Sequence, residues 1–210
     1  MLSRLATALV PAFGPLTVTT DPAAELAPGS IIAANHTSLA DPAIVLAALD
    51  RLGLRPAVLA TAGLWRVPLL GAALVREGHI PVRRGTARAG EALDGAARAL
   101  AAGRSVLIYG EGGLPHRRDS GEAPPERFRS GLARLAAATG APVLPLGQAG
   151  ARRLSSGSAA KQVAGLATGP LRRPGFHVHL GAPVRAADPA VLHAAVTAAW
   201  QVAAGVPAAA

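Results

Sequence analysis

Residues 30–53 read SIIAANHTSLADPAIVLAALDRLG and contain a short apolar run, a polar loop and a second, longer apolar run. The first run, 30–34, predicts a buried strand because it is short, apolar and followed by turn-forming residues. The second predicts a helix, with Pro42 near its first turn and Gly53 just past its end. A strand that leads through a polar loop into a helix is typical of α/β sheets.

The same alternation continues along the chain. Further strands are predicted at 56–61, 79–82, 105–109, 141–147 and 176–184. Further helices are predicted at 86–103, 129–140 and 188–205. We therefore expect an α/β fold: a single domain with a mostly parallel central sheet flanked by helices.

Two segments interrupt the alternation. Residues 63–78 form an apolar helical pattern that Pro68 breaks, and residues 151–175 predict a mobile surface excursion. The expected organisation is a single domain over residues 1–210, divided into an N-terminal segment (1–29), a core that carries the motifs (30–147), and a loop, strand and closing helix (148–210).

Composition narrows the range of functions. The chain has 210 residues, a net charge of +9 and no cysteine. The charge favours anionic partners: phosphorylated substrates, acidic lipid surfaces or nucleic acid. Nucleic acid is the least favoured, because aromatic residues make up only 3% of the chain and no nucleic-acid-binding motif is present. The lack of cysteine excludes disulfides, thiolate nucleophiles and Cys-ligated metals.

The loop NHTSLADP, residues 35–42, places His36 and Asp41 five positions apart. A histidine can abstract a hydroxyl proton near neutral pH, and a carboxylate on its other ring nitrogen fixes the tautomer and stabilises the imidazolium. The alternative is a turn in which Asp41 only caps the following helix. The spacing alone does not decide between the two.

Two other polar segments lie at the ends of predicted strands, where ligands collect in open α/β sheets. In GHIPVRRG, residues 78–85, Arg83 and Arg84 follow the strand and suit bidentate phosphate binding. In YGEGG, residues 109–113, Glu111 lies between glycines whose amides can cradle an anion. The alternatives are that the two arginines are ordinary solvated charges and that the glycine turn binds no ligand.

Taken together and in this order, NHTSLADP, GHIPVRRG, YGEGG and APVLPLG (141–147) resemble the four sequence blocks of the glycerolipid acyltransferase family. Its best-known members are the 1-acyl-glycerol-3-phosphate (lysophosphatidate) acyltransferases. The resemblance runs from about Ser30 to Gly147. It implies a glycerol-3-phosphate acyltransferase-like fold.

The resemblance also implies a mechanism. His36 would deprotonate the free hydroxyl of a lysophospholipid, with Asp41 holding the imidazole in place. The hydroxyl would then attack the thioester of acyl-CoA or acyl carrier protein directly, without an acyl-enzyme and without a cofactor. The absence of cysteine and of a Gly-x-Ser-x-Gly elbow agrees with this.

By the same resemblance, further residues are candidates for substrate binding. These are Asn35, Gly78, Arg84, Glu111, Gly112 and Gly113. The third block of the family usually reads Pro-Glu-Gly-Thr-Arg, whereas here Gly110, Gly113 and Leu114 replace the proline, the threonine and the arginine. Further candidates to bind the acceptor are Arg83, Arg117 and Arg118. The altered block leaves open a lyso-aminolipid or glycolipid acceptor, and a degenerate homologue that binds lipid without turnover.

A lysolipid acceptor implies contact with a bilayer. Residues 1–10 predict a short interfacial helix, and residues 63–75 either lay Trp65, Leu69 and Leu70 against lipid or pack on the sheet. Basic residues near both stretches favour an anionic leaflet: Arg4, Arg51, Arg55, Arg66 and Arg76. With neither a spanning stretch nor a clear signal peptide, we expect a cytoplasmic protein bound peripherally to the inner face of the plasma membrane.

Other polar residues are not assigned to the site. His177 and His179 share a strand face, but no further ligands have suitable spacing, so no metal site is predicted. His79 is expected at the surface, although it is near enough to the second block to touch substrate. Ser38 is expected to form hydrogen bonds within its turn, not to act as a nucleophile.

Overall fold

Strand β2 (Ile31–Ala34) lies in the middle of a seven-stranded sheet whose order is β1-β7-β6-β2-β5-β3-β4. The computed structural model describes residues 1–85, 90–114, 119 and 121–206. The other strands are β1 (Leu16–Thr20), β3 (Ala57–Thr61), β4 (Ile80–Val82), β5 (Val106–Tyr109), β6 (Val143–Ala149) and β7 (Phe176–Leu180). All pairings are parallel except that of β6 with β7. The predicted fold class is confirmed.

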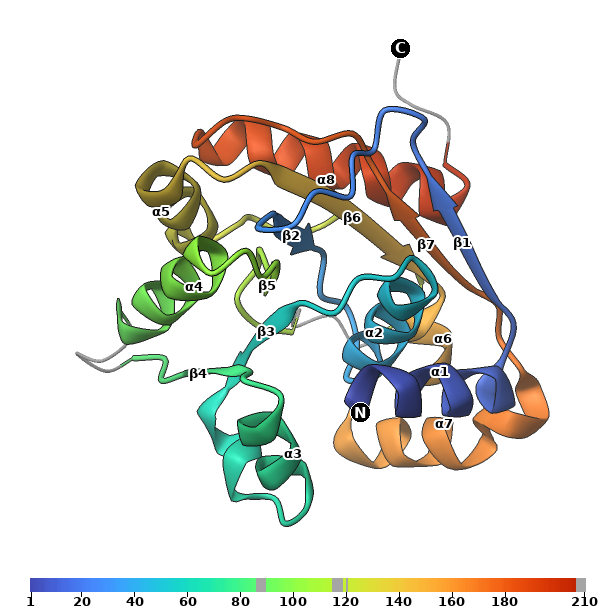
Figure 1. Ribbon diagram of the computed structural model, residues 1–210. Coiled ribbons are helices and arrows are strands. Elements are labelled where there is room, and N and C mark those ends of the chain that lie inside the picture. Colours follow the sequence, from blue (N-terminus) through green and yellow to red (C-terminus); the bar gives the residue numbers. More distant parts are fainter. Residues whose placement is uncertain (86–89, 115–118, 120, 207–210) are drawn as a thin grey trace.

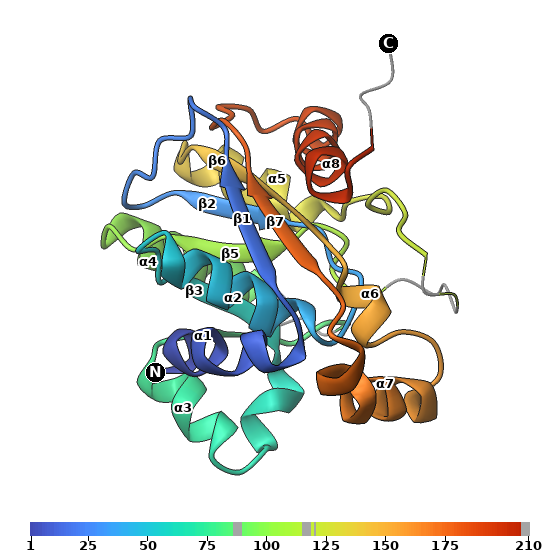
Figure 2. The same ribbon diagram turned by 90° about the vertical axis from the view of Figure 1, so that its right-hand side faces the viewer.

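The helices cover both faces of this sheet (Figure 1). They are α1 (Leu2–Phe13), α2 (Asp41–Arg51), η1 (Ala62–Arg66, a 3-10 helix), α3 (Leu70–Arg76), α4 (Glu91–Ala101), α5 (Ser130–Thr139), α6 (Ala151–Leu154), α7 (Ala159–Arg172) and α8 (Pro189–Ala204). Helices α1 and α2 pack in one hydrophobic core, and α4, α5 and α8 pack in the other. The two layers can be followed in Figure 2.

Strand β2 contributes to both cores. Ile32 and Ala34 point into one, while Ile31 and Ala33 point into the other. A strand buried on both faces needs a continuous apolar run, which is why 30–34 lacks the alternation of a half-exposed strand. The chain after Ala34 therefore emerges at the carboxyl edge of the sheet, between β5 and β6. Crevices at such edges are the usual ligand sites of open α/β folds.

The structure corrects the expectation for 151–175. This segment is not an irregular excursion but contains α6 and α7. Two glycines of this segment are packing positions: a Cβ at Gly165 would lie 2.2 Å from the carbonyl oxygen of Leu154, and one at Gly169 would lie 2.4 Å from the Leu154 side chain. Ser158 caps α7 by accepting a hydrogen bond from the Lys161 amide.

The N-terminal 29 residues also contain more structure than predicted. Helix α1 continues past Pro11 to Phe13, and residues 16–20 form β1, an edge strand that pairs with β7. Edge pairing with a strand that arrives 160 residues later leaves no local signal beyond a short alternating run. At the other end of the chain, Asp188 caps α8, accepting hydrogen bonds from the amides of Ala190 and Val191.

The apolar stretch after β3 divides at Pro68 into η1 and α3. Ala73 and Leu74 pack inward, whereas Val67, Leu69 and Val75 are exposed, Leu69 by 88%. Packing on the sheet therefore accounts for only part of this segment. No helix in the described ranges is long and apolar enough to span a bilayer.

Candidate active site

Asn35 fastens the loop after β2 to the neighbouring strand. Its side-chain amide donates to the carbonyl oxygen of Gln148 (3.0 Å), and its side-chain oxygen accepts from the Gln148 amide (2.8 Å). Both residues are completely buried. The Gln148 side chain also donates to Thr37 Oγ1 at 2.8 Å. A buried reciprocal pair of this kind is costly to break, so it holds the backbone on both sides of His36.

Asp41 lies at the start of α2 but does not cap it. Its Oδ2 accepts hydrogen bonds from the preceding loop: from His36 Nδ1 at 2.9 Å, from the Ser38 amide at 2.9 Å, and from the Thr37 amide. Asp41 is fully buried, and the helix has no side-chain cap. Of the two alternatives that the spacing left open, the geometry matches the contact with histidine.

This contact determines the tautomer of His36. With Nδ1–H donating to Asp41, Nε2 carries the lone pair. Within the described residues Nε2 has no hydrogen-bond partner, and the His36 side chain is 14% exposed. A histidine in this state can accept a proton from a ligand that approaches the carboxyl edge of the sheet.

The imidazole of His36 stacks on the ring of Tyr109, the last residue of β5. The ring centroids are 4.4 Å apart and the planes are inclined by 28°. Burial, together with the nearby Asp41 and Glu111, raises the pKa of Tyr109 well above its ordinary value. The phenol is therefore neutral, and its ring limits the orientations that the imidazole can adopt.

Glu111 approaches His36 from the turn after β5. Its Oε2 accepts a hydrogen bond from the His36 backbone amide at 3.0 Å. Burial raises the pKa of Glu111 to about 8, and the charges of Asp41 and Glu126 add to the effect. At neutral pH the group is therefore mostly a protonated carboxylic acid, which does not repel an anion nearby.

Two arginines lie against the glycine turn after Glu111. A Cβ atom at Gly112 would lie 2.7 Å from Cδ of Arg129, and one at Gly113 would lie 3.6 Å from Nη1 of Arg84. Gly112 also has a φ of +67°, which side chains rarely adopt. Burial and the charge of Arg129 lower the pKa of Arg84, which indicates two cations close together. Such a pair is suited to an anionic group of a ligand.

Not every predicted residue joins this group. Arg83 turns away to form an ion pair with Glu91 of α4 at 3.2 Å. Gly78 lies before the amino end of β4, on the opposite edge of the sheet from His36, where its carbonyl accepts from Arg104. Arg117 and Arg118 lie outside the described residues.

His79 and Ser38 have structural partners. His79 is buried, contrary to its expected surface position, and its Nδ1 accepts from the Val58 amide at 3.0 Å. Ser38 Oγ donates to the Ser155 carbonyl at 2.6 Å and accepts from the Ala40 amide. These bonds stabilise the loop, as expected for Ser38.

The two histidines of β7 share a partner on β1: Thr19 Oγ1 lies 2.9 Å from ring nitrogens of both His177 and His179. No three His, Asp or Glu side chains gather as a metal site in the described part of the chain.

Sequence reasoning missed Arg129, Gln148 and Arg152. Arg129 looked like the first residue of a helix, and Gln148 follows a predicted strand, which is a signal that could have identified it. Arg152 is 3% exposed and donates to the carbonyls of Thr37 (3.3 Å), Gly121 (2.8 Å) and Asp119. Nothing in its surroundings in the sequence distinguishes it from the surface arginines.

Comparisons with known proteins identify the family and the fold. A family model described as "Acyltransferase" matches residues 16–148, which include His36, Asp41 and Glu111. Among solved structures, the chain resembles the 1-acyl-sn-glycerophosphate (LPA) acyltransferase PlsC from Thermotoga maritima, with a TM-score of 0.72 and 19% identity. The match covers 100% of this chain and 79% of that one, and at this identity it concerns the fold. No curated protein matches the sequence significantly.

Proposed function

The chain belongs to the acyltransferase family, which confirms the resemblance of its sequence blocks, and from this premise we propose that it acylates the free hydroxyl of an anionic lysolipid such as 1-acyl-glycerol-3-phosphate. The observation that carries the proposal is the His36 Nδ1 to Asp41 Oδ2 contact of 2.9 Å, which leaves Nε2 free at the edge where Arg84 and Arg129 gather.

The chemistry requires a single displacement. Nε2 of His36 accepts the proton of the acceptor hydroxyl while the oxygen attacks the carbonyl carbon of the acyl thioester. The new C–O bond forms, the C–S bond breaks, and the imidazolium returns the proton to the departing thiolate. Asp41 stabilises the imidazolium in between, because it accepts the Nδ1–H. No protein nucleophile is needed, and the chain contains no cysteine.

The acceptor class follows from the charges. Arg84 and Arg129 offer bidentate donors to a phosphate, and the neutral Glu111 between them and His36 removes a source of repulsion. Arg129 thus offers the cation that the third block lacks at Leu114. These features favour a phosphate-bearing acceptor over a lyso-aminolipid or glycolipid.

Several finer assignments belong to the same proposal. The donor is acyl-CoA or acyl carrier protein, and the steps above require no cofactor. The enzyme acts in the cytoplasm, bound peripherally at the inner face of the plasma membrane. The lack of any spanning helix among the described residues is compatible with this location.

The direct test is thiol release from palmitoyl-CoA, and from palmitoyl-acyl carrier protein, across a panel of phosphorylated and uncharged lysolipids. We expect release that requires a phosphorylated acceptor and that disappears in His36→Ala. His177→Ala is the matched control, because the His177 ring contacts Thr19 of the edge strand β1 and not the catalytic pair. Folding of each variant is checked by circular dichroism. Vesicle binding without release from any donor would favour the degenerate lipid-binding alternative.

A further inference from the structure

Helix α7 has its apolar side facing away from the protein. At 100° per residue, Val163, Leu166 and Leu171 share one side of the helix, and all three are exposed, Leu171 by 87%. The opposite side carries Gly165 and Gly169, which lie against Leu154 and Phe13. A surface helix normally buries its apolar stripe and exposes its polar one. Helix α7 does the reverse, so its outer side is available to an apolar partner.

Two neighbouring segments share this property. Leu5 and Leu9 of α1 are exposed, as are Val67 and Leu69 at the η1–α3 turn. We call the exposed side chains of Leu5, Leu9, Val67, Leu69, Val163 and Leu171 the apolar face. Figures 1 and 2 show α1, α3 and α7 at the same, lower end of the molecule.

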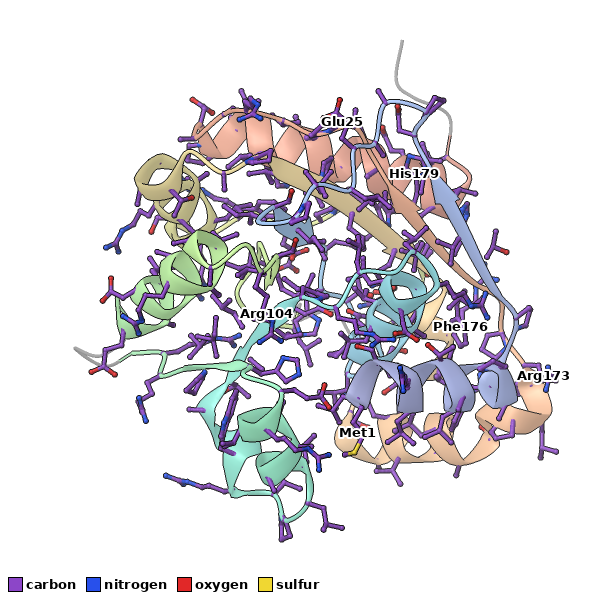
Figure 3. The ribbon with its side chains drawn as sticks, in the orientation of Figure 1. Met1, Glu25, Arg104, Arg173, Phe176 and His179 are labelled. Atoms are coloured by element: carbon purple, nitrogen blue, oxygen red, sulfur yellow. The ribbon has the colours of Figure 1, made fainter. Side chains whose placement is uncertain are left out.

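Contacts connect the three segments. The N-terminal amine that begins α1 lies 2.9 Å from Glu77, the residue after α3. At the other end of α1, the carbonyl of Pro11 accepts from Arg173, the residue after α7, at 3.2 Å. Figure 3 shows Met1 and Arg173 along this end of the molecule. The three segments that carry the apolar face are therefore held in contact through α1.

Charge identifies the partner. Residues 2–13, 62–76 and 159–172 contain no Asp or Glu, although the chain has 12 acidic residues. They do contain cations, namely Arg4, Arg66, Arg76, Lys161 and Arg172. The carboxylate of Glu77, the residue after α3, is paired with the N-terminal amine. Apolar side chains on segments that carry cations and no acidic residue of their own match an anionic bilayer, where the apolar groups enter the interface and the cations meet lipid headgroups.

The position of the face relates it to the candidate site. Segment η1–α3 leaves the carboxyl end of β3, and α6–α7 leave the carboxyl end of β6. Strand β2 pairs in parallel with β5 and β6, and β5 pairs in parallel with β3, so all four strands end at the same edge of the sheet. His36 follows the end of β2, and Glu111 follows the end of β5. We infer that the apolar face docks on an anionic bilayer, with α7 as a principal contact, so that a lysolipid reaches His36 from the membrane. The last step rests on the proposed function, whereas the docking does not.

The docking is tested by co-sedimentation with phosphatidylcholine vesicles, with and without phosphatidylglycerol. The test variant is Val163→Ser/Leu171→Ser, and the control is Val191→Ser/Val202→Ser, which alters two exposed apolar residues of α8. We expect the wild type to bind the anionic vesicles and to dissociate at high salt. The vesicle partition coefficient of the test variant should fall about tenfold for each substituted side chain, because each wild-type side chain buries its aliphatic surface in the bilayer. The partition coefficient of the control should not fall.

Three results would overturn the inference: equal binding by the test variant, no binding by the wild type, or a wild-type dimer that the α7 substitutions dissociate.

A second assay separates this inference from the proposed function. It compares transfer to an acceptor embedded in vesicles with transfer to a short-chain acceptor dispersed as monomers. The α7 variant should lose transfer only to the embedded acceptor, whereas His36→Ala should bind vesicles but transfer to neither. Vesicle binding through α7 without any transfer would leave the docking intact and refute the proposed function.

Discussion

Gly110 lies against the ring of Phe128, so closely that a Cβ atom on Gly110 would come within 2.5 Å of the ring. The contact accounts for the glycine where the third block of the family usually has proline, because the ring fills the space that a side chain would need. It also bears on the site. Phe128 precedes Arg129, whose amide donates to the Gly110 carbonyl at 2.9 Å, so the pair helps to place Arg129 beside the glycine turn.

This contact predicts coupled stabilities. Gly110→Ala should lower the free energy of unfolding by about 1–3 kcal/mol, because the added methyl overpacks a filled site. In a Phe128→Leu background the same substitution should cost less, since the ring is gone. Urea denaturation of the wild type, both single variants and the double variant measures the coupling energy. Additive effects would show that the ring is not what excludes a side chain at 110.

Asp41→Asn tests the orientation of His36. The amide cannot accept from His36 Nδ1 and from the Thr37 and Ser38 amides as the carboxylate does, so the tautomer with a free Nε2 is no longer favoured. We expect kcat to fall by about 10²- to 10⁴-fold, the usual contribution of a positioned general base. Asp50→Asn is the control on the same helix, where Asp50 pairs with Arg55. Full activity in folded Asp41→Asn would contradict the assigned role.

The two arginines should affect the acceptor and not the donor. Arg84→Ala and Arg129→Ala should each lower kcat/KM for a phosphorylated lysolipid by about 10- to 100-fold, the cost of one charge-assisted contact. Neither should affect the KM of the acyl thioester. Arg83→Ala is the adjacent control, because Arg83 is directed to Glu91 instead. Equal losses in all three variants would point to a general effect of charge.

Glu111 should make the protein less stable as the pH rises. The pKa of Glu111 is about 8 in the folded protein, against 4.5 for an ordinary glutamate. The stabilisation from the neutral carboxyl is therefore complete below about pH 4.5 and is lost progressively up to about pH 8. The loss should not exceed about 1.4 kcal/mol per pH unit. Glu111→Gln, which stays neutral, should remove this slope.

Urea titrations of the wild type and Glu111→Gln at pH 5, 6, 7 and 8 measure the difference. Taking the difference matters because burial lowers the pKa of His79, which contributes a slope of the opposite sign to both proteins. Parallel stability curves for the two proteins would mean that Glu111 is already ionised in the folded state at pH 5.

Much of the fold and part of the site could be predicted because the controlling interactions are local. A doubly buried strand needs an uninterrupted apolar run, and the helix after it needs a start and a stop, so residues 30–53 predicted β2 and α2 from their own pattern. His36 and Asp41 are five residues apart in one turn, and the sequence could place them within reach of each other without any tertiary information.

The tertiary structure alone decided which distant residues join them. Arg129 and Gln148 come from segments about a hundred residues further along, and only the placement of β2 between β5 and β6 brings those segments to His36. The same topology puts Gly78 at the opposite edge, although it stands in a block with Arg84. Spacing along a chain specifies neighbours within a turn or a helix. The order of strands in a sheet is set instead by how all the apolar faces are buried at once, which no single segment encodes.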